Sequence, residues 1–152
     1  MNIRISKKLI SISAGLVLGI FPPMLVYAEC IPSELAGTWY TYSMSVDSGG
    51  SYAPQTNRCK VKINSAGSIV ATKSSCKVRS RTGLINVNVT GGSIIVNSKC
   101  SLSGSIKISG PAGSSTIKLE YGTVAKDNKT LSLVAYDAGD RSYITHLTGV
   151  KR

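Results

Sequence analysis

The sequence predicts an all-β protein, an antiparallel up-and-down meander of about eight strands that closes into a small barrel. After residue 30, apolar residues recur at every second position, as in strands, and not at helical spacing. Glycine, proline, aspartate and asparagine separate these runs at turn positions. A meander must also protect its edge strands, and closure into a barrel does so. A sandwich is the alternative fold.

Residues 1–28 have the features of a secretory signal peptide. Three basic residues precede an apolar stretch, Leu9–Phe21, which is too short to span a bilayer. Val26-Tyr27-Ala28 supplies the small residues that a signal peptidase requires. We therefore expect a bacterial protein that is cleaved after Ala28 and is periplasmic or secreted, with no transmembrane segment left after cleavage. An uncleaved anchor and a lipid on Cys30 are the alternatives.

The remaining residues, 29–152, are expected to form a single domain. Residues 1–28 hold three of the 18 basic residues and none of the seven acidic ones, so the domain carries a formal charge of +8. Its 124 residues are enough to bury one hydrophobic core.

All four cysteines follow the expected cleavage site, and an even number in an exported chain favours two disulfides. A zinc site would need closer cysteine pairs or additional histidines. Three pairings of the four are possible. Because Cys59 and Cys76 flank one predicted hairpin, we favour Cys59–Cys76 and Cys30–Cys100.

The first strand contains Trp39, the only tryptophan, within an alternating run. The second strand alternates Val61 and Ile63 with lysines. Ser65-Ala66-Gly67 is expected to turn the chain into a return strand that begins at Ile69.

The next segment is predicted to be another hairpin. Leu84–Val89 alternates apolar residues with asparagines, and Gly91-Gly92 is a hairpin turn by residue type. Ile94–Val96 then forms the return strand. Both predicted hairpins run on to a cysteine, Cys76 or Cys100, so we expect a repeated supersecondary unit.

The last part of the chain is predicted to contain four further strands. The runs are 102–108, 117–121, 131–135 and 143–147, with turns at Gly110-Pro111, Asp127-Asn128-Lys129 and Asp137-Ala138-Gly139-Asp140.

The side chains of the first strand can face the core in two ways. If Trp39 faces inward, the interior wall is polar and suits a small hydrogen-bonding ligand better than a fatty acid. That wall consists of Thr41, Ser43 and Ser45 beside Trp39. With the opposite alternation the core residues are Tyr40, Tyr42, Met44 and Val46, and Trp39 caps one end. The number of apolar side chains favours this second arrangement.

The longest connection predicted is Asp47 to Asn57, with Tyr52 at its centre. It forms either a lid over the barrel mouth or a mobile surface loop. The candidate ligand-binding residues are Trp39, Thr41, Ser43 and Tyr52.

Gly37-Thr38-Trp39 resembles the G-x-W signature that opens the calycin barrels, which include lipocalins, fatty-acid-binding proteins and avidins. The resemblance implies that Trp39 plugs one end of the barrel. It also implies that a basic residue of the last strand, Arg152 or Lys151, covers the indole. The avidin resemblance, which extends to Tyr40, ends there because the further biotin-binding tryptophans are absent.

The stretch Ser33–Trp39 also resembles the start of the periplasmic metalloprotease inhibitors. That resemblance implies an inhibitory N-terminal tail, here 29–32, which a bridged Cys30 would tie down. An immunoglobulin-type sandwich is disfavoured because its hallmark tryptophan lies well inside the chain, whereas Trp39 is on the first predicted strand.

Basic residues form two alternating triplets that would share one surface if their strands are neighbours. The triplets are Arg58, Lys60, Lys62 and Lys77, Arg79, Arg81. This face either attracts a polyanion, such as an envelope polysaccharide or a membrane, or protects strand edges from pairing. Neither triplet contains an aromatic residue for base stacking, which argues against nucleic acid.

The sequence contains no recognisable catalytic constellation. His146 is the only histidine, there is no G-x-S-x-G motif, and the aspartates lie in predicted turns. No phosphate loop, metal cluster or cofactor motif occurs, so we expect no cofactor and no metal. We expect an exported, non-enzymatic binding protein for a small molecule or another protein. A protease inhibitor and an envelope component that binds polyanions are the alternatives.

Overall fold

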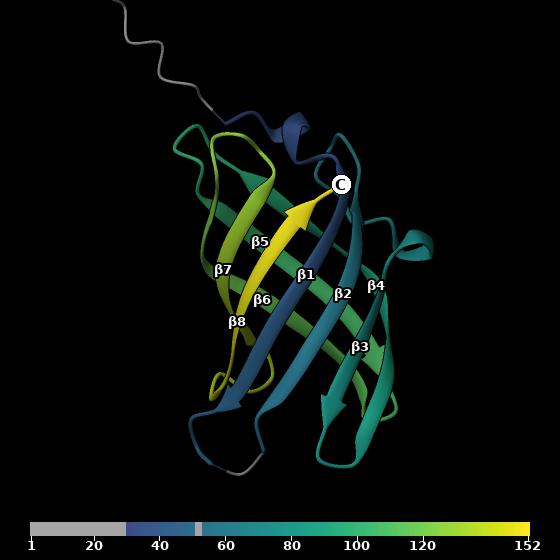
Figure 1. Ribbon diagram of the computed structural model, residues 1–152. Coiled ribbons are helices and arrows are strands. Elements are labelled where there is room, and N and C mark those ends of the chain that lie inside the picture. The colour runs from purple at the N-terminus through teal and green to yellow at the C-terminus, as the bar shows by residue number, and fades with distance from the viewer. Residues whose placement is uncertain (1–29, 51–52) are drawn as a thin grey trace, which may run out of the picture.

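The computed structural model describes residues 30–50 and 53–152, which form eight antiparallel strands closed into one barrel (Figure 1). Each strand pairs with the next in the chain, and β1 also pairs with β8. The strands are β1 (Gly37–Asp47), β2 (Gln55–Ile63), β3 (Ser75–Ser80), β4 (Gly83–Val96), β5 (Leu102–Gly110), β6 (Gly113–Val124), β7 (Thr130–Asp137) and β8 (Tyr143–Lys151). The expected all-β meander and its closure into a barrel are confirmed.

Two short 3₁₀ helices, η1 (Pro32–Leu35) and η2 (Ala71–Lys73), complete the secondary structure of the described part. The predicted signal peptide lies outside the described residues. Within 30–50 and 53–152, no helix has the length and apolar character needed to cross a membrane.

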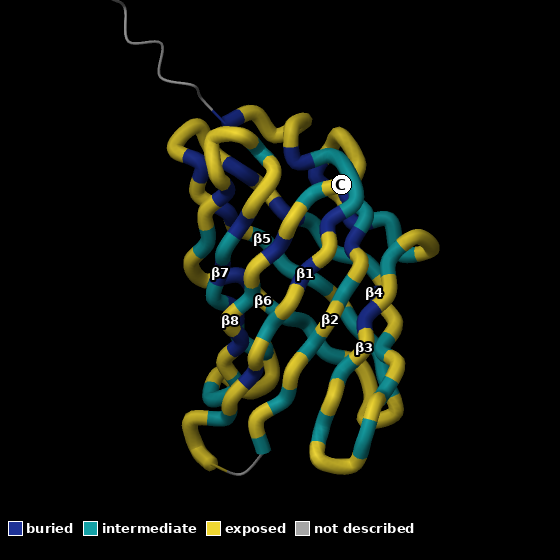
Figure 2. The backbone as a smooth tube through the Cα atoms, in the orientation of Figure 1, coloured by how far each residue is buried: buried dark blue, intermediate teal, exposed yellow. Residues whose placement is uncertain are grey.

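The alternation along β1 is the reverse of the one that the apolar count favours. Trp39, Thr41 and Ser45 are buried in the barrel, whereas Tyr42 and Met44 are more than half exposed outside it. Figure 2 shows buried and exposed positions alternating along β1. Tyr40 and Val46 are also exposed. Counting the apolar side chains on each face of β1 gave the wrong inward face. The count assumes that apolar side chains fill the interior, and this barrel has several of them on its outer surface.

The chain does not turn at Gly91-Gly92, as the glycine pair had predicted. Strand β4 runs through both residues, and its register with β5 shifts between Val89 and Gly91. A Cβ atom on Gly92 would lie 2.2 Å from the carbonyl oxygen of Ser105. The two glycines therefore lie at a β-bulge of β4, where β4 and β5 approach closely. Such a bulge lets a sheet bend into a barrel.

The predicted return strand at Ile69 is also wrong. Ile69 makes only an isolated bridge to Ile63, helix η2 follows, and the return strand is β3, which contains Cys76. Hence β2 and β3 pair across a longer connection, and β3 and β4 form a tight hairpin. The second predicted cysteine-bearing hairpin is absent because β4 runs through Gly91-Gly92, so the proposed repeat is absent too.

A different similarity links the two cysteine-containing regions. Asn64 and Asn97 begin matching turns in which each side-chain oxygen accepts bonds from the amides two and four residues later. The residue three positions after each asparagine has a positive φ, which is 79° at Gly67 and 64° at Cys100. Cys100 thus occupies a backbone conformation that normally favours glycine.

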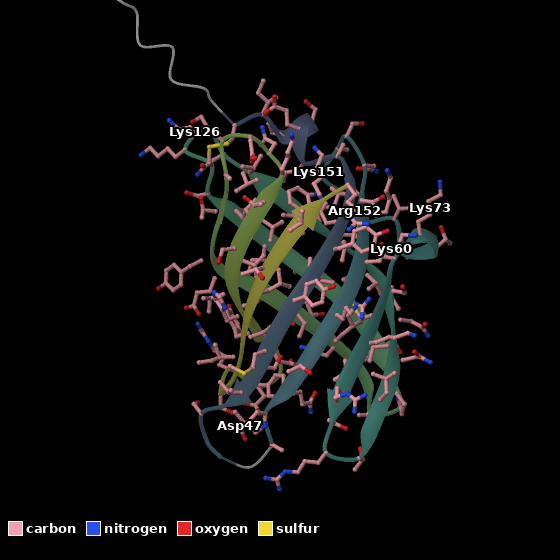
Figure 3. All side chains as sticks on the ribbon, in the orientation of Figure 1. Asp47, Lys60, Lys73, Lys126, Lys151 and Arg152 are labelled. Carbon is pink, nitrogen blue, oxygen red and sulfur yellow. A yellow bond between two sulfur atoms is a disulfide. The ribbon has the colours of Figure 1, made fainter. Side chains whose placement is uncertain are left out.

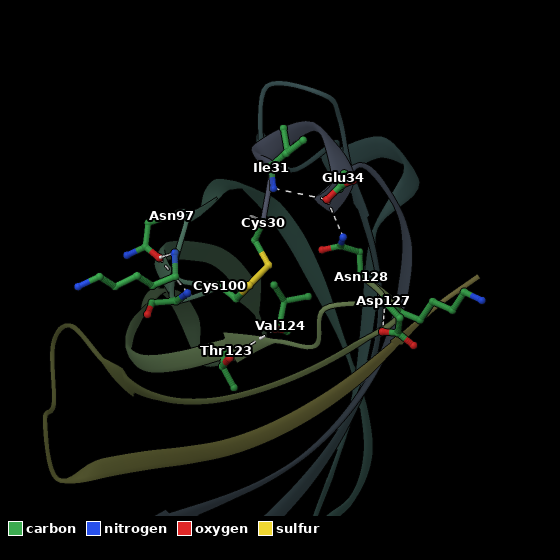
Figure 4. The surroundings of a disulfide bond; sticks show 12 residues. Cys30, Ile31, Glu34, Asn97, Cys100, Thr123, Val124, Asp127 and Asn128 are labelled. Atoms are coloured by element: carbon green, nitrogen blue, oxygen red, sulfur yellow. Dashed lines mark hydrogen bonds between the residues drawn. A yellow bond between two sulfur atoms is a disulfide. The ribbon is translucent and has the colours of Figure 1, made fainter. Parts of the chain in front are cut away.

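Both favoured disulfide pairings are confirmed. Cys59 and Cys76 face each other across β2 and β3, and Cys30 is bonded to Cys100. The second bridge ties the chain before η1 to the β4–β5 turn (Figure 4). Two disulfides are compatible with an oxidising, extracytoplasmic compartment.

The N-terminal segment closes one end of the barrel. Leu35, at the end of η1, is fully buried, and its carbonyl oxygen accepts a 2.8 Å hydrogen bond from the Trp39 indole. Glu34 Oε2 accepts a 2.6 Å bond from Asn128 in the β6–β7 turn (Figure 4). Together with the Cys30–Cys100 bridge, these contacts fix η1 across this end.

Candidate functional site

The interior of the barrel contains a cavity of about 160 Å³. Its lining changes in character along the barrel axis. Toward the closed end the lining is apolar and includes Trp39, Val61, Ile63, Ile94, Leu131 and Leu133. Toward the other end, where the β1–β2 and β7–β8 connections lie, it is polar and includes Ser43, Ser45, Gln55, Asn57, Asp137, Tyr143 and Thr145. An amphipathic molecule matches this gradient.

Trp39 forms the floor of the cavity, with 1% of its surface exposed. The Nζ atom of Lys151 lies 5.9 Å from the centre of its ring and donates a hydrogen bond to the Glu34 carbonyl oxygen. Of the two basic residues expected to cover the indole, Lys151 takes this place. Arg152 lies instead over Tyr40, at 5.4 Å, on the outer surface.

Hydroxyl and amide groups form a connected network at the polar end. The hydroxyls of Ser45 and Thr145 are 2.8 Å apart, and Asn57 Nδ2 donates to Ser45 Oγ at 2.8 Å. Tyr143 also forms a hydrogen bond with Ser45. These residues come from β1, β2 and β8, which are adjacent in the barrel.

One atom of this network has no hydrogen-bond partner among residues 30–50 and 53–152. Asn57 Oδ1 is buried and accepts no hydrogen bond from the described residues. A buried acceptor without a partner costs about 1–3 kcal/mol, so such atoms are rare in folded proteins. Asn57 lines the cavity, and its side chain must turn before Oδ1 can accept a hydrogen bond from a group that enters there.

Asp137 adds a negative charge to the polar end. It ends β7, accepts a hydrogen bond from Ser115, and lines the cavity. Burial is the main cause that raises the pKa of Tyr143, and the charges of Asp137 and Asp47 raise it further. Tyr143 is thus a neutral hydroxyl at physiological pH. The polar end presents acceptors and neutral hydroxyls, which favour a ligand that donates hydrogen bonds.

Sequence reasoning located part of this cavity. Trp39, Thr41 and Ser43 line it, whereas Tyr52 lies outside the described residues. The connection proposed as a lid is shorter than expected, because Gln55–Asn57 belongs to β2. Asn57 and Asp137 were not recognised as candidates, since their residue types are typical of loops and turns. The alternation of β2 back from Cys59 would have placed Asn57 inside.

The two basic triplets do lie side by side, because β2 pairs with β3 and Arg58 faces Lys77. We call this surface the cationic face: Arg58, Lys60, Lys62, Lys77, Arg79 and Arg81. Arg81 lies in the β3–β4 turn. None of the six forms an ion pair with a carboxylate of residues 30–50 or 53–152.

His146 lies on the outer surface of β8, opposite Met44 of β1, and its Nε2 is 3.4 Å from Ser132 Oγ. In the described part of the chain, no three metal-binding side chains are grouped closely enough to hold an ion.

Comparison with known proteins gives similarity of structure only. No family model matches the sequence, and no curated protein matches it. A de novo designed fluorescence-activating β-barrel is 15% identical with a TM-score of 0.45, and the match covers 77% of this chain and 93% of that one. A redesigned β-barrel is 12% identical with a TM-score of 0.47, and the match covers 80% and 94% of the two chains.

Proposed function

We propose that this protein is an exported, non-enzymatic binding protein of the calycin type, periplasmic or secreted, that holds a small amphipathic molecule inside its barrel. The apolar part of the ligand lies toward Trp39, and a hydrogen-bond donor, an amine or hydroxyl, meets Asn57. The observation that carries the proposal is the unpartnered Asn57 Oδ1 at the polar end of a cavity whose other end is apolar.

The charge at the polar end sets the expected order of ligands. Asp137 and Asn57 Oδ1 both accept hydrogen bonds, and Asp137 attracts a cation. An alkylamine should therefore bind more tightly than the alcohol of equal length, and both should bind more tightly than the carboxylate. The disulfide between Cys30 and Cys100 supports this proposal over an inhibitory N-terminal tail, because it ties the tail to the barrel at Cys30.

The test compares n-octylamine, n-octanol and n-octanoate by thermal shift and calorimetry. Asn57→Leu removes the unpartnered acceptor, so it should weaken octylamine binding about tenfold or more while stability changes by less than about 1 kcal/mol. The Asn57→Leu substitution also removes the hydrogen bond from Asn57 Nδ2 to Ser45. The stability lost with that bond offsets the stability gained by removing a buried acceptor that has no partner.

Asn86→Leu is the matched control, since Asn86 lies exposed on the outer surface of β4. It should leave binding unchanged. Equal affinity for the amine and the carboxylate, or full affinity in Asn57→Leu, would contradict the proposed site.

A further inference from the structure

The outer surface of β1 carries a row of exposed apolar and aromatic side chains, which we call the β1 ridge. Its members are Tyr40, Tyr42, Met44 and Val46. The ridge continues onto β8, where exposed Val150 lies opposite Tyr40 and exposed Ile144 lies opposite Val46. On β8 the polar residues Thr148 and His146 lie between these two, so the unbroken apolar row is the one on β1. Exposed apolar side chains that gather in one row, and are not scattered singly, point to an interaction surface.

The cationic face borders this ridge directly. Arg58 faces Tyr42 across β1 and β2, with its guanidinium carbon 5.7 Å from the ring centre, and Lys60 faces Tyr40. Arg152 lies over the Tyr40 ring, and Figure 3 places Arg152 and Lys60 at the same end of this surface. No carboxylate of the described residues neutralises the cationic face by an ion pair. A partner for this surface is therefore anionic.

The apolar residues decide which kind of anion fits. Met44, Val46 and Ile144 offer nothing to a phosphodiester or polysaccharide chain, but aliphatic groups beside tyrosines suit the boundary between lipid headgroups and acyl chains. Arginine and lysine beside that boundary extend their charged ends to the phosphates while their stems cover apolar surface. A convex barrel meets a flat surface along a strip, and the neighbouring strands β8, β1, β2 and β3 provide one.

We propose that the outer face of β8, β1, β2 and β3 docks this protein on an anionic lipid bilayer. The β1 ridge enters the headgroup boundary, and the cationic face contacts the lipid phosphates. This docking uses outward-facing side chains of the barrel wall, whereas the cavity is lined by inward-facing ones such as Trp39, Thr41 and Ser43.

The experiment is co-sedimentation of the protein with vesicles of phosphatidylcholine alone and with vesicles containing phosphatidylglycerol. A charge variant, Arg58→Gln/Lys77→Gln/Arg79→Gln, tests the cationic face. Each basic residue near an anionic surface strengthens binding about fivefold, so this variant should bind about a hundredfold more weakly. Its matched control removes three exposed lysines from elsewhere, Lys99→Gln/Lys107→Gln/Lys118→Gln.

A ridge variant, Tyr42→Ser/Met44→Ser, separates lipid binding from simple attraction between charges. It leaves the charge unchanged and should weaken binding to the anionic vesicles about tenfold or more. Its control, Ile95→Ser/Tyr121→Ser, removes two exposed apolar side chains on β4 and β6 and should bind like the unchanged protein. All substituted residues are exposed, and circular dichroism verifies that each variant is folded.

The proposal is supported if only the anionic vesicles bind the protein, and if the charge and ridge variants both lose binding while their controls keep it. It is overturned if anionic vesicles do not bind at low salt, where screening is weakest. It is also overturned if the charge variant and its control lose binding equally. Retention on heparin or oligothymidylate that the ridge variant leaves unchanged, with no ridge effect on vesicles, identifies a polyanion in place of a bilayer.

Discussion

Tyr143 shows how one residue at the cavity end affects stability. Burial raises its pKa above the ordinary value of 10.0, and the charges of Asp137 and Asp47 act in the same direction. A raised pKa in the folded state contributes stability that is fully present below the unfolded pKa. That contribution is lost as pH rises through the folded pKa.

We therefore predict that the free energy of unfolding declines as pH rises above 10, and that this decline is smaller in Tyr143→Phe. Urea unfolding on either side of pH 10 measures it. Tyr121→Phe is the control, since Tyr121 is 70% exposed. Removing its hydroxyl should leave the pH dependence of the free energy of unfolding the same as in the unchanged protein. An identical pH dependence in Tyr143→Phe and the unchanged protein would be inconsistent with a buried, neutral Tyr143.

At the residue scale, the sequence predicted the cysteine pairs and the importance of Trp39 but not the direction of the β1 side chains. Pairing Cys59 with Cys76 required only one hairpin. Choosing between Thr41 and Tyr42 as the inward residue required knowledge of what lies outside the barrel. Tyr42 contacts Arg58, and that exterior contact is invisible to a count of apolar residues.

At the scale of elements, the bulge of β4 is the feature that lets a long strand continue where a turn was expected. Gly92 has a φ of 123°, and a Cβ atom there would overlap the Ser105 carbonyl oxygen. Glycine pairs predict hairpins because they tolerate positive φ, and a bulge uses the same property. Residue type alone does not separate these outcomes, whereas the close approach of β5 does.

We predict that Gly92→Ala lowers the free energy of unfolding by about 2–4 kcal/mol, from backbone strain and from overlap with β5. Gly83→Ala is the control, because Gly83 has a φ of 124° but no atom within 4 Å of a Cβ. That control should cost only the strain, about 1–2 kcal/mol. Chemical denaturation of both variants gives the comparison, and equal losses would refute the steric role of Gly92.

At the scale of the whole molecule, the barrel separates two surfaces with different chemistry. Its interior runs from the apolar floor at Trp39 to hydrogen-bonding groups around Asn57. Its exterior combines the β1 ridge with the cationic face. The fold class, the closure and most strands were predictable from period-two patterns and turn residues. Of the cavity's polar end, only Ser43 and Ser45 of β1 were considered; the others were missed because they come from strands far apart in the sequence.

The measurement that most directly tests the cavity as a binding site is quenching of the fluorescence of Trp39 by 8-bromooctylamine. Trp39 is the only tryptophan, is 1% exposed, and forms the cavity floor. Binding as proposed predicts saturable quenching that shifts to about tenfold higher concentration in Asn57→Leu. Fluorescence that stays unquenched, or that falls without saturation and equally in both proteins, would contradict a ligand within the barrel.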